Sequence, residues 1–244
     1  MPLNSLLRNT SIPLLALLLL GGCATQQDIL PQQKRPTDFP TNFYGDYKGS
    51  GTIYKIDSYK ADSPASRILI TVRRGGLMAS LGHDHIVASH DLQGFILLDR
   101  DSPQNPNCRA DFYAQLANLE VDNAQLRTEA VLLTTPSEKD IAGTTSNMLK
   151  SIEAENFPFA RLHSSDCLAA LSGEQTEVLL TIHGVDRKQK IAIQIEEVSD
   201  SKLILSGKFS ILQTDFGIQP FSIMNGLIKV EDRLELVFRI VAQR

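Results

Sequence analysis

From Thr52 onward, apolar and polar residues alternate with a period of two over most of the chain. Successive side chains of a β-strand point to opposite faces, so this alternation predicts strands that bury one face and expose the other. The clearest such segments are residues 68–72, 92–98, 110–116, 178–182, 191–195, 203–214 and 233–242. With a further strand expected at 159–166, we predict about eight antiparallel strands.

Two local patterns add a hairpin and a helix to these strands. The tetrapeptide from Gly184 to Arg187 separates the segments 178–182 and 191–195, which indicates a hairpin turn. The segment from Thr135 to Glu138 is typical of a capping box with proline at the first helical position. The helix that begins there is expected to end at Phe157-Pro158. One face of this helix carries the apolar residues Ile141, Met148, Leu149 and Ile152.

Eight alternating antiparallel strands have two ways to bury their apolar faces. They stack as two sheets, or they close into a barrel whose interior is just wide enough for side chains or one small ligand. No long crossover separates the strands into two sets. The sequence therefore favours an all-β fold, an antiparallel eight-strand β-barrel with one main helix.

The N-terminal residues have the layout of a secretory signal peptide. A short polar segment with Arg8 precedes an apolar run at 14–20, and small residues follow before Cys23. Leu20-Gly21-Gly22-Cys23 resembles a bacterial lipobox, in which the cysteine becomes the acylated first residue of the mature protein. The alternative is an uncleaved anchor helix or a buried core segment.

The lipobox divides the chain into three parts. We expect a signal peptide at 1–22, a lipidated N-terminus with a flexible linker at 23–50, and a barrel domain at 51–244. This organisation predicts a palmitate-bearing lipoprotein of the bacterial envelope that faces the periplasm. Ala24, where an aspartate would retain the protein in the inner membrane, favours the outer membrane.

The charge balance argues against one class of partner. The chain carries 24 Lys and Arg against 28 Asp and Glu. Nucleic-acid binding requires clusters of basic residues, which a mildly acidic chain of this kind lacks. We therefore expect no nucleic-acid partner.

Cys108 and Cys167 remain once Cys23 is assigned to the lipid. In an oxidising compartment two such thiols are expected to form a disulfide. The alternative is two separate buried thiols, since a free cysteine behaves as a small hydrophobic residue. Neither a CxxC motif nor a Cys/His zinc spacing occurs.

Five short segments of the barrel region resemble the YceI-like family, whose members are lipocalin-like barrels of periplasmic and secreted bacterial proteins. They are an opening strand, a strand marked by glycine and aspartate, an aromatic-proline step, a hairpin and a D-F-G-I sequence: residues 66–72, Gly94-Phe95 with Asp99, 156–160, 180–185 and 214–218. The resemblance covers about residues 51–244. It implies a lipocalin-like barrel that binds a long isoprenoid, such as a polyprenyl quinone or polyprenyl phosphate.

Carriage of such a ligand requires no catalytic group and no cofactor besides the bound lipid. An apolar tunnel would remove the isoprenoid tail from water, at roughly 25 cal/mol per Å² of buried apolar surface. The candidate ligand-binding residues are His83, His85, Phe95, Phe112, Phe216 and Phe221. The alternative for any of the phenylalanines is packing in the core, because a barrel of this size can be filled by side chains.

The sequence His83-Asp84-His85 is the polar cluster whose side chains are best suited to bind an ion or a polar group. On an extended strand the two imidazoles project from the same face, and a pair of them can begin a metal site. Zinc needs at least three protein ligands, so the sequence assigns no metal site and leaves His83 and His85 as candidates for metal or for a lipid head group. The alternative is that they hydrogen-bond the backbone in a loop. The residues that would have to complete a metal site are His90, Asp91, His163 or His183.

The sequence shows no G-x-S-x-G nucleophile elbow and no evident acid/base pair, so we do not expect an enzyme. Our first hypothesis is a membrane-anchored periplasmic binding protein that carries or stores an isoprenoid or another amphiphilic lipid. A second hypothesis is a metal-binding or redox-linked protein that uses His83 and His85. A third is a structural envelope lipoprotein with a filled barrel, whose partner is another protein.

Overall fold

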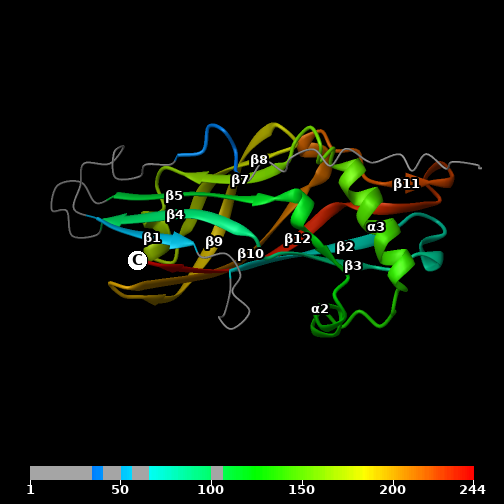
Figure 1. The fold of residues 1–244 in the computed structure, drawn as a ribbon, viewed down its shortest axis with the longest axis horizontal. Coiled ribbons are helices and arrows are strands. Elements are labelled where there is room, and N and C mark those ends of the chain that lie inside the picture. Colours follow the sequence, from blue (N-terminus) through cyan, green and yellow to red (C-terminus); the bar gives the residue numbers. More distant parts are fainter. Residues whose placement is uncertain (1–34, 41–50, 57–65, 100–106) are drawn as a thin grey trace, which may run out of the picture. The chain divides into compact units, whose positions relative to one another are not determined.

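Eight strands of the chain close into an antiparallel β-barrel, as the alternation predicts (Figure 1). The computed structural model describes residues 35–40, 51–56, 66–99 and 107–244, so the expected signal peptide, Cys23 and most of the linker lie outside the described residues. In spatial order the barrel strands are β1 (Thr52–Ile56), β4 (Leu92–Asp99), β5 (Asn107–Gln115), β7 (Phe159–Ser164), β8 (Gln175–Ile182), β9 (Val185–Val198), β10 (Lys202–Leu212) and β12 (Ile228–Gln243).

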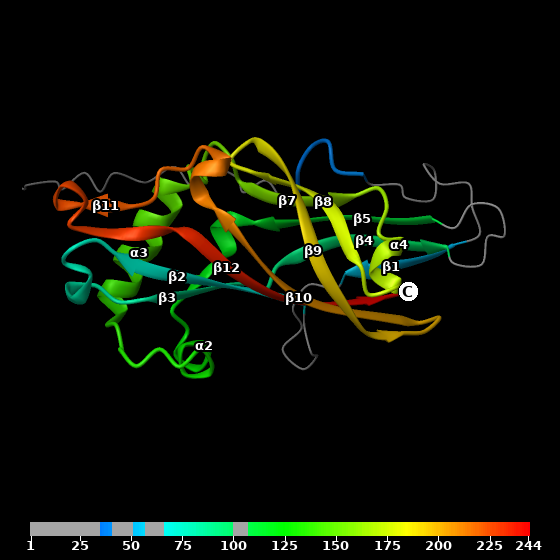
Figure 2. The ribbon, with the colours of Figure 1, turned by 180° about the vertical axis from the view of Figure 1, so that it is seen from behind.

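The last barrel strand, β12, has two different neighbours on one of its edges. Near its C-terminal end it pairs with β1, through Lys55 opposite Gln243 and Ile56 opposite Ala242, and this pairing closes the barrel. From Lys229 to Arg239 the same edge pairs with β2 (Arg67–Gly75). The strands β3 (His85–Ser89) and β6 (Glu120–Val121) continue the sheet beyond β2, and Figure 2 shows β2 and β3 from behind. We call β2, β3 and β6 the wing.

Alternation in β2 gives the wing two apolar faces. Ile68 and Ile70 pack with the barrel core, whereas Leu69 between them packs on the opposite face with Ile86 and Leu126. Leu126 belongs to helix α2 (Ala124–Glu129), which therefore covers the outer face of the wing. The two-residue period of the strand is the reason that one segment serves both layers.

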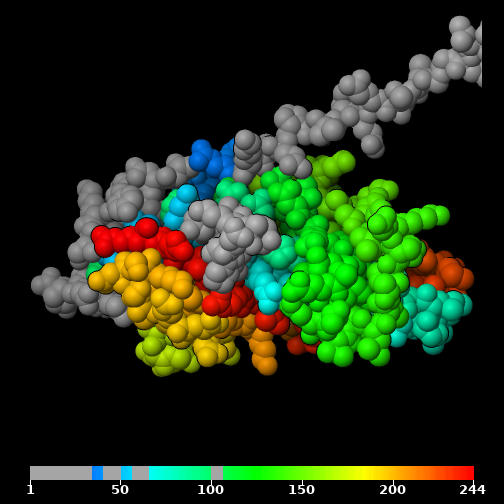
Figure 3. Space-filling view, turned by 60° about the horizontal axis from the view of Figure 1, so that its bottom comes forward, coloured from blue at the N-terminus to red at the C-terminus, as the bar shows by residue number. Residues whose placement is uncertain are grey.

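The main helix, α3 (Glu138–Ser151), crosses in front of β12 and β2 in Figure 1, with α2 below them. Ile152 at its C-terminal end packs in the same core cluster as Ile70 and Leu234. In the space-filling view, the green side chains of α2, α3 and the segment between them form one continuous surface beside the cyan residues of the wing (Figure 3). The wing therefore lies between two helices that come from one stretch of the chain.

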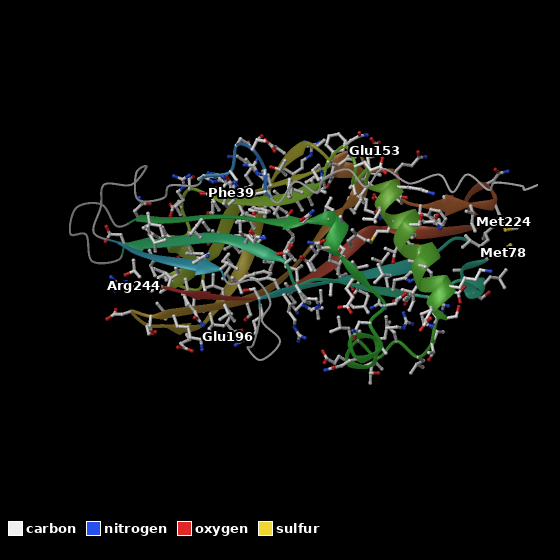
Figure 4. All side chains as sticks on the ribbon, in the orientation of Figure 1. Phe39, Met78, Glu153, Glu196, Met224 and Arg244 are labelled. Carbon is white, nitrogen blue, oxygen red and sulfur yellow. A yellow bond between two sulfur atoms is a disulfide. The ribbon has the colours of Figure 1, made fainter. Side chains whose placement is uncertain are left out.

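Short elements complete the fold. A hydrogen bond from Met78 N to Leu227 O (2.8 Å) joins the turn between β2 and β3 to the turn before β12. Figure 4 shows Met78 and Met224 at the same end of the molecule, opposite Arg244. The exposed apolar side chains at this end are Leu77, Leu81, Ile223 and Met224. The short elements are η1 (Ala79–Leu81), η2 (Leu116–Asn118), α4 (Leu168–Leu171), η3 (Gln213–Phe216), β11 (Ser222–Ile223) and η4 (Met224–Gly226).

Two local expectations are wrong in detail. The hairpin turn consists of His183 and Gly184, with φ of 53° and 70°, and Val185 already begins the next strand. Two residues with positive φ suit the right-handed twist of the flanking strands. The cap of α3 is Ser137 rather than Thr135, because Ser137 and Asp140 exchange the reciprocal hydrogen bonds of a capping box. The helix also ends at Ser151, before Phe157.

The count of strands is larger than the sequence suggests. The described residues contain twelve strands, of which eight form the closed barrel and four (β2, β3, β6 and β11) lie outside it. The segment 68–72, whose alternation is among the clearest, is in the wing rather than in the ring. Alternation reports a strand with two different faces and does not report which strands are its neighbours.

Candidate functional site

The barrel interior contains an apolar cavity of about 140 Å³. Its walls come from β4, β5, β7, β8, β9, β10 and β12, together with Ile68 of the wing and part of α4. Of the residues that line it, three are polar: Arg161, Ser164 and Thr176. The inward-facing residues of seven strands therefore form most of the cavity wall.

The volume of the cavity sets a limit on what fits without movement. A dry cavity of about 150 Å³ lined by Leu, Ile and Phe holds a molecule the size of benzene. One five-carbon isoprene unit has a similar size, so a longer chain requires lining side chains to move apart. Several of these side chains are only half-buried, which shows that the interior is not packed solid: Ile193, Ile195, Leu205, Phe209 and Phe238.

A disulfide forms part of the cavity wall. Cys108 of β5 and Cys167, the residue before α4, are bonded with their Cα atoms 4.9 Å apart, and both line the cavity. The helix α4 packs on β8 and β9 and lies at the same end of the barrel as the C-terminus (Figure 2). The disulfide therefore holds α4 across one end of the barrel.

Two hydroxyl groups face this apolar surface. Ser164 Oγ donates to the backbone oxygens of Asp166 (3.1 Å) and Glu177 (3.2 Å). Thr176 is 1% exposed, and its Oγ1 has no hydrogen-bond partner among the described residues. A buried hydroxyl without a partner costs free energy, so Thr176 is the polar position of the cavity at which a ligand group would be stabilised.

The structure separates the phenylalanines that the sequence groups as candidates. Phe112 lines the cavity. Phe95 packs on the other side of the strands, against Ile53 and Leu97. Phe216 is 2% exposed in the core around η3, and Phe221 accepts a hydrogen bond from Val230 N at its backbone oxygen.

His83 and His85 are not among the residues that line the cavity. Their rings are 4.6 Å apart between centroids. His85 Nδ1 is 2.6 Å from Asp122 Oδ2, and the other oxygen of Asp122 accepts hydrogen bonds from Ile86 N (3.1 Å) and from Arg127. Donor atoms of His83, His85 and Asp122 all lie within 4.8 Å of one another. This group, which we call the histidine cluster, joins the segment 83–85 to Asp122, which is distant in the sequence.

The local chain explains why Asp122 points inward. It follows β6 and precedes the N-cap of α2, Asn123, and its φ of 54° is in the left-handed region that aspartate tolerates better than most residues. Its backbone N donates to Ile86 O (2.8 Å) and its side chain is fully buried. The carboxylate therefore meets β3 at the base of the histidine cluster.

Charge within the cluster is compensated. Arg127 is 5% exposed at its side chain and also donates to the backbone oxygens of Asp84 and Thr134. Burial alone would raise the pKa of Asp122, and the hydrogen bonds from His85, Ile86 N and Arg127 outweigh it, so the pKa lies below its ordinary value. Burial, followed by the neighbouring His85, lowers the pKa of His83.

The structure completes the histidine pair with a residue that the sequence analysis did not consider. His90 pairs with Glu120, His163 with Asp111 and His183 with Phe216 O, so none of these histidines joins the cluster. Asp122 is the third member instead. Its position 36 residues beyond Ile86 follows from the pairing of β3 with β6, a contact that no local pattern reveals.

A closed antiparallel barrel with an apolar interior cavity defines the class of this protein, the small antiparallel β-barrel proteins. In the described part of the chain, no helix is both long and apolar enough to cross a bilayer.

The family follows from comparison with known proteins. The profile of the YceI-like domain matches residues 59–242, so the chain belongs to the YceI-like family. None of the curated proteins matches the chain.

Three of the solved structures to which the chain is similar illustrate the range of these matches. One is a polyisoprenoid binding domain from Saccharophagus degradans implicated in plant cell wall breakdown, at 12% identity over 78% of this chain and 97% of that one, with a TM-score of 0.49. Another is BcnA of Burkholderia cenocepacia, at 15% identity, 72% and 96% coverage and a TM-score of 0.48. The YceI protein of Campylobacter jejuni matches at 15% identity, 65% and 84% coverage and a TM-score of 0.41.

Proposed function

We propose that this protein binds a long isoprenoid or a similar amphiphilic lipid inside its barrel and carries or stores it without catalysis. The observation that supports this most directly is the apolar cavity, with Arg161, Ser164 and Thr176 as its polar lining residues. The isoprenoid class itself comes from the resemblance to the YceI-like family.

The energetics of the cavity fit an isoprenoid tail. Each CH₂ moved from water into an apolar site contributes about 0.8 kcal/mol, so one five-carbon unit contributes roughly 4 kcal/mol. Movement of half-buried lining residues such as Phe209 and Phe238 would admit further units. Thr176 Oγ1 offers a hydrogen bond to a polar group of the ligand.

We also propose that Cys23 is lipidated and that the barrel is held at the bacterial envelope, facing the periplasm from the outer membrane. The support is the lipobox-like sequence ending at Cys23. The Cys108–Cys167 disulfide agrees with an oxidising compartment, because structural disulfides persist there and are rare in the cytosol. A protein partner in the envelope remains part of the alternative hypothesis.

Native mass spectrometry of the full-length protein, purified from an envelope extract, tests the proposal. We expect an added mass that matches a polyprenyl species and that organic extraction removes. A bare polypeptide mass, together with no binding of added polyprenyl quinone or polyprenyl phosphate, would contradict lipid carriage. It would leave the filled structural barrel as the better hypothesis.

A further inference from the structure

The histidine cluster has features that simple packing does not require. His83 Nε2 is buried and has no hydrogen-bond partner among the described residues. The other four histidines of the chain each have a carboxylate or backbone oxygen beside a ring nitrogen. A buried imidazole nitrogen without a partner is unfavourable, and such a group calls for an explanation such as an ion.

The cluster is also held in place by its surroundings. Asp122 is fixed by Arg127, by Ile86 N and by its own left-handed backbone, which costs roughly 1 kcal/mol or more and persists where the surrounding structure demands it. His85 is fixed by β3 pairing, in which it lies opposite Val72. These constraints orient donor groups before any ligand arrives, which reduces the cost of binding.

We propose that His83, His85 and Asp122 bind one divalent first-row transition-metal ion such as Zn²⁺. Imidazole suits zinc, copper, iron and nickel, and two imidazoles with one carboxylate make a donor set that proteins use for such ions. Three protein ligands leave at least one coordination position for water or another donor. This site is separate from the apolar cavity and does not depend on the proposed lipid carriage.

The rearrangement needed for binding is small. Ligand atoms on a tetrahedral zinc ion lie about 3.4 Å apart, given bonds of about 2.0–2.1 Å to each. The three donors already lie within 4.8 Å of one another, so side-chain rotation is sufficient. The ion takes the place of the hydrogen between His85 Nδ1 and Asp122 Oδ2, and the neutral His85 ring then carries its one proton on Nε2.

The residues around the cluster can hold the proposed ligand side chains in position. Arg127 stays on the Asp122 oxygen that faces away from His85 and fixes the carboxylate. Asp140, in the first turn of α3, interacts electrostatically with His83 and adds negative charge near the cluster.

A Co²⁺ titration of the full-length, chelator-treated protein, followed by competition with Zn²⁺, tests the site. We expect one ion per chain, a visible cobalt d–d absorption typical of fewer than six ligands, and displacement of cobalt by zinc. His83→Ala should weaken binding at least 100-fold. The matched control is His163→Ala, which removes the histidine of a similar His–Asp pair that has no second histidine beside it, and should leave affinity unchanged within twofold.

The wild-type titration is decisive even if a variant folds poorly. Absence of saturable binding of both ions to the wild-type protein would overturn the site. Equal loss of affinity in the His83→Ala and His163→Ala proteins would also overturn it, since it would point to general destabilisation. His83→Ala removes no hydrogen bond of the described structure, so we expect its thermal unfolding without metal to match the wild type.

Discussion

Cys108 and Cys167 are joined by a disulfide, and both side chains form part of the cavity wall. The bond links β5 of the barrel to the residue before α4, across a sequence separation of 59 residues. It is therefore both a constraint on the unfolded chain and a piece of the surface that a ligand would contact.

Removing this bond is expected to destabilise the fold. A loop of 59 residues corresponds to about 4 kcal/mol of unfolded-state entropy at 25 °C. Replacing both Cys108 and Cys167 by alanine should lower the free energy of unfolding by an amount of that order. Urea denaturation of this variant and of the wild type checks it, and equal midpoints would contradict a structural role for the bond.

A ring placed inside the cavity should abolish lipid binding. Ala110 lines the cavity, and a benzene-sized group occupies a cavity of about 140 Å³. We expect Ala110→Phe to fold and to lose at least nine-tenths of the bound lipid seen in native mass spectra. Ala192→Phe places the same ring at an exposed position on β9 and should retain the lipid. Equal retention by both variants would contradict binding in this cavity.

The buried hydroxyl of Thr176, which has no hydrogen-bond partner among the described residues, should lower the free energy of unfolding of the ligand-free protein. Thr176→Val keeps the shape and removes a buried hydroxyl without a partner, so we expect a gain of about 1–2 kcal/mol in the free energy of unfolding. Thr181→Val is the control, because Thr181 Oγ1 donates to Asp186 (2.7 Å) and its loss should not stabilise. Denaturant unfolding of delipidated protein measures both. A loss in Thr176→Val would show that the hydroxyl has a partner.

Two glycines should respond in opposite directions to alanine. Gly94 has a φ of 154°, and a Cβ there would overlap the Asp111 carbonyl and the Phe112 backbone. We expect Gly94→Ala to lower the free energy of unfolding by about 2–4 kcal/mol. Gly143, inside α3, has no atom near its Cβ position, so Gly143→Ala should raise stability by about 0.5–1 kcal/mol. Thermal unfolding of both variants decides it, and a tolerated Gly94→Ala would contradict the close β4–β5 approach.

The ion pair between Asp38 and Arg161 should stop stabilising the fold in acid. The hydrogen bond from Arg161 holds the pKa of Asp38 below its ordinary value of 3.8, and Phe39 next to it packs on Tyr113. Because the folded-state pKa is depressed, the stabilisation is present above the unfolded pKa and disappears as the pH falls through the folded one. The pair is largely exposed, so its contribution is about 0.2–1 kcal/mol.

Denaturation at pH 7 and at pH 3 tests this ion pair. Asp38→Asn should be less stable than the wild type at pH 7, and the difference should shrink at pH 3. Asp200→Asn, at an exposed position, serves as the control and should match the wild type at pH 7. A difference between Asp38→Asn and the wild type that grows in acid would contradict the sign of the effect.

The barrel could be predicted because its physical cause is local. Alternation in segments such as 178–182 and 191–195 requires that one face be buried, and eight such strands without a crossover favour closure. The wing could not be predicted in the same way. Residues 68–72 alternate as clearly as any barrel strand, and only the long-range pairing of β2 with β12 and β3 assigns them to the wing.

The candidate sites show the same division. His83 and His85 were found because two residues of separation on an extended strand place side chains on one face. Asp122 was missed because no sequence pattern predicts its positive φ after β6 or the pairing of β6 with β3. These two features bring its carboxylate to the histidines. Phe112 lines the cavity, whereas Phe95 follows Gly94, the residue that pairs with Phe112, and faces the other layer; only strand pairing distinguishes them.

The shared strand β12 has a thermodynamic consequence. Its residues 229–239 pair with the wing and its residues 242–243 close the ring, so neither part can lose β12 without damaging the other. Ring and wing should therefore unfold as a single cooperative unit. Any ion held at the wing would then raise the melting temperature of the barrel by mass action alone, with no contact between the two sites.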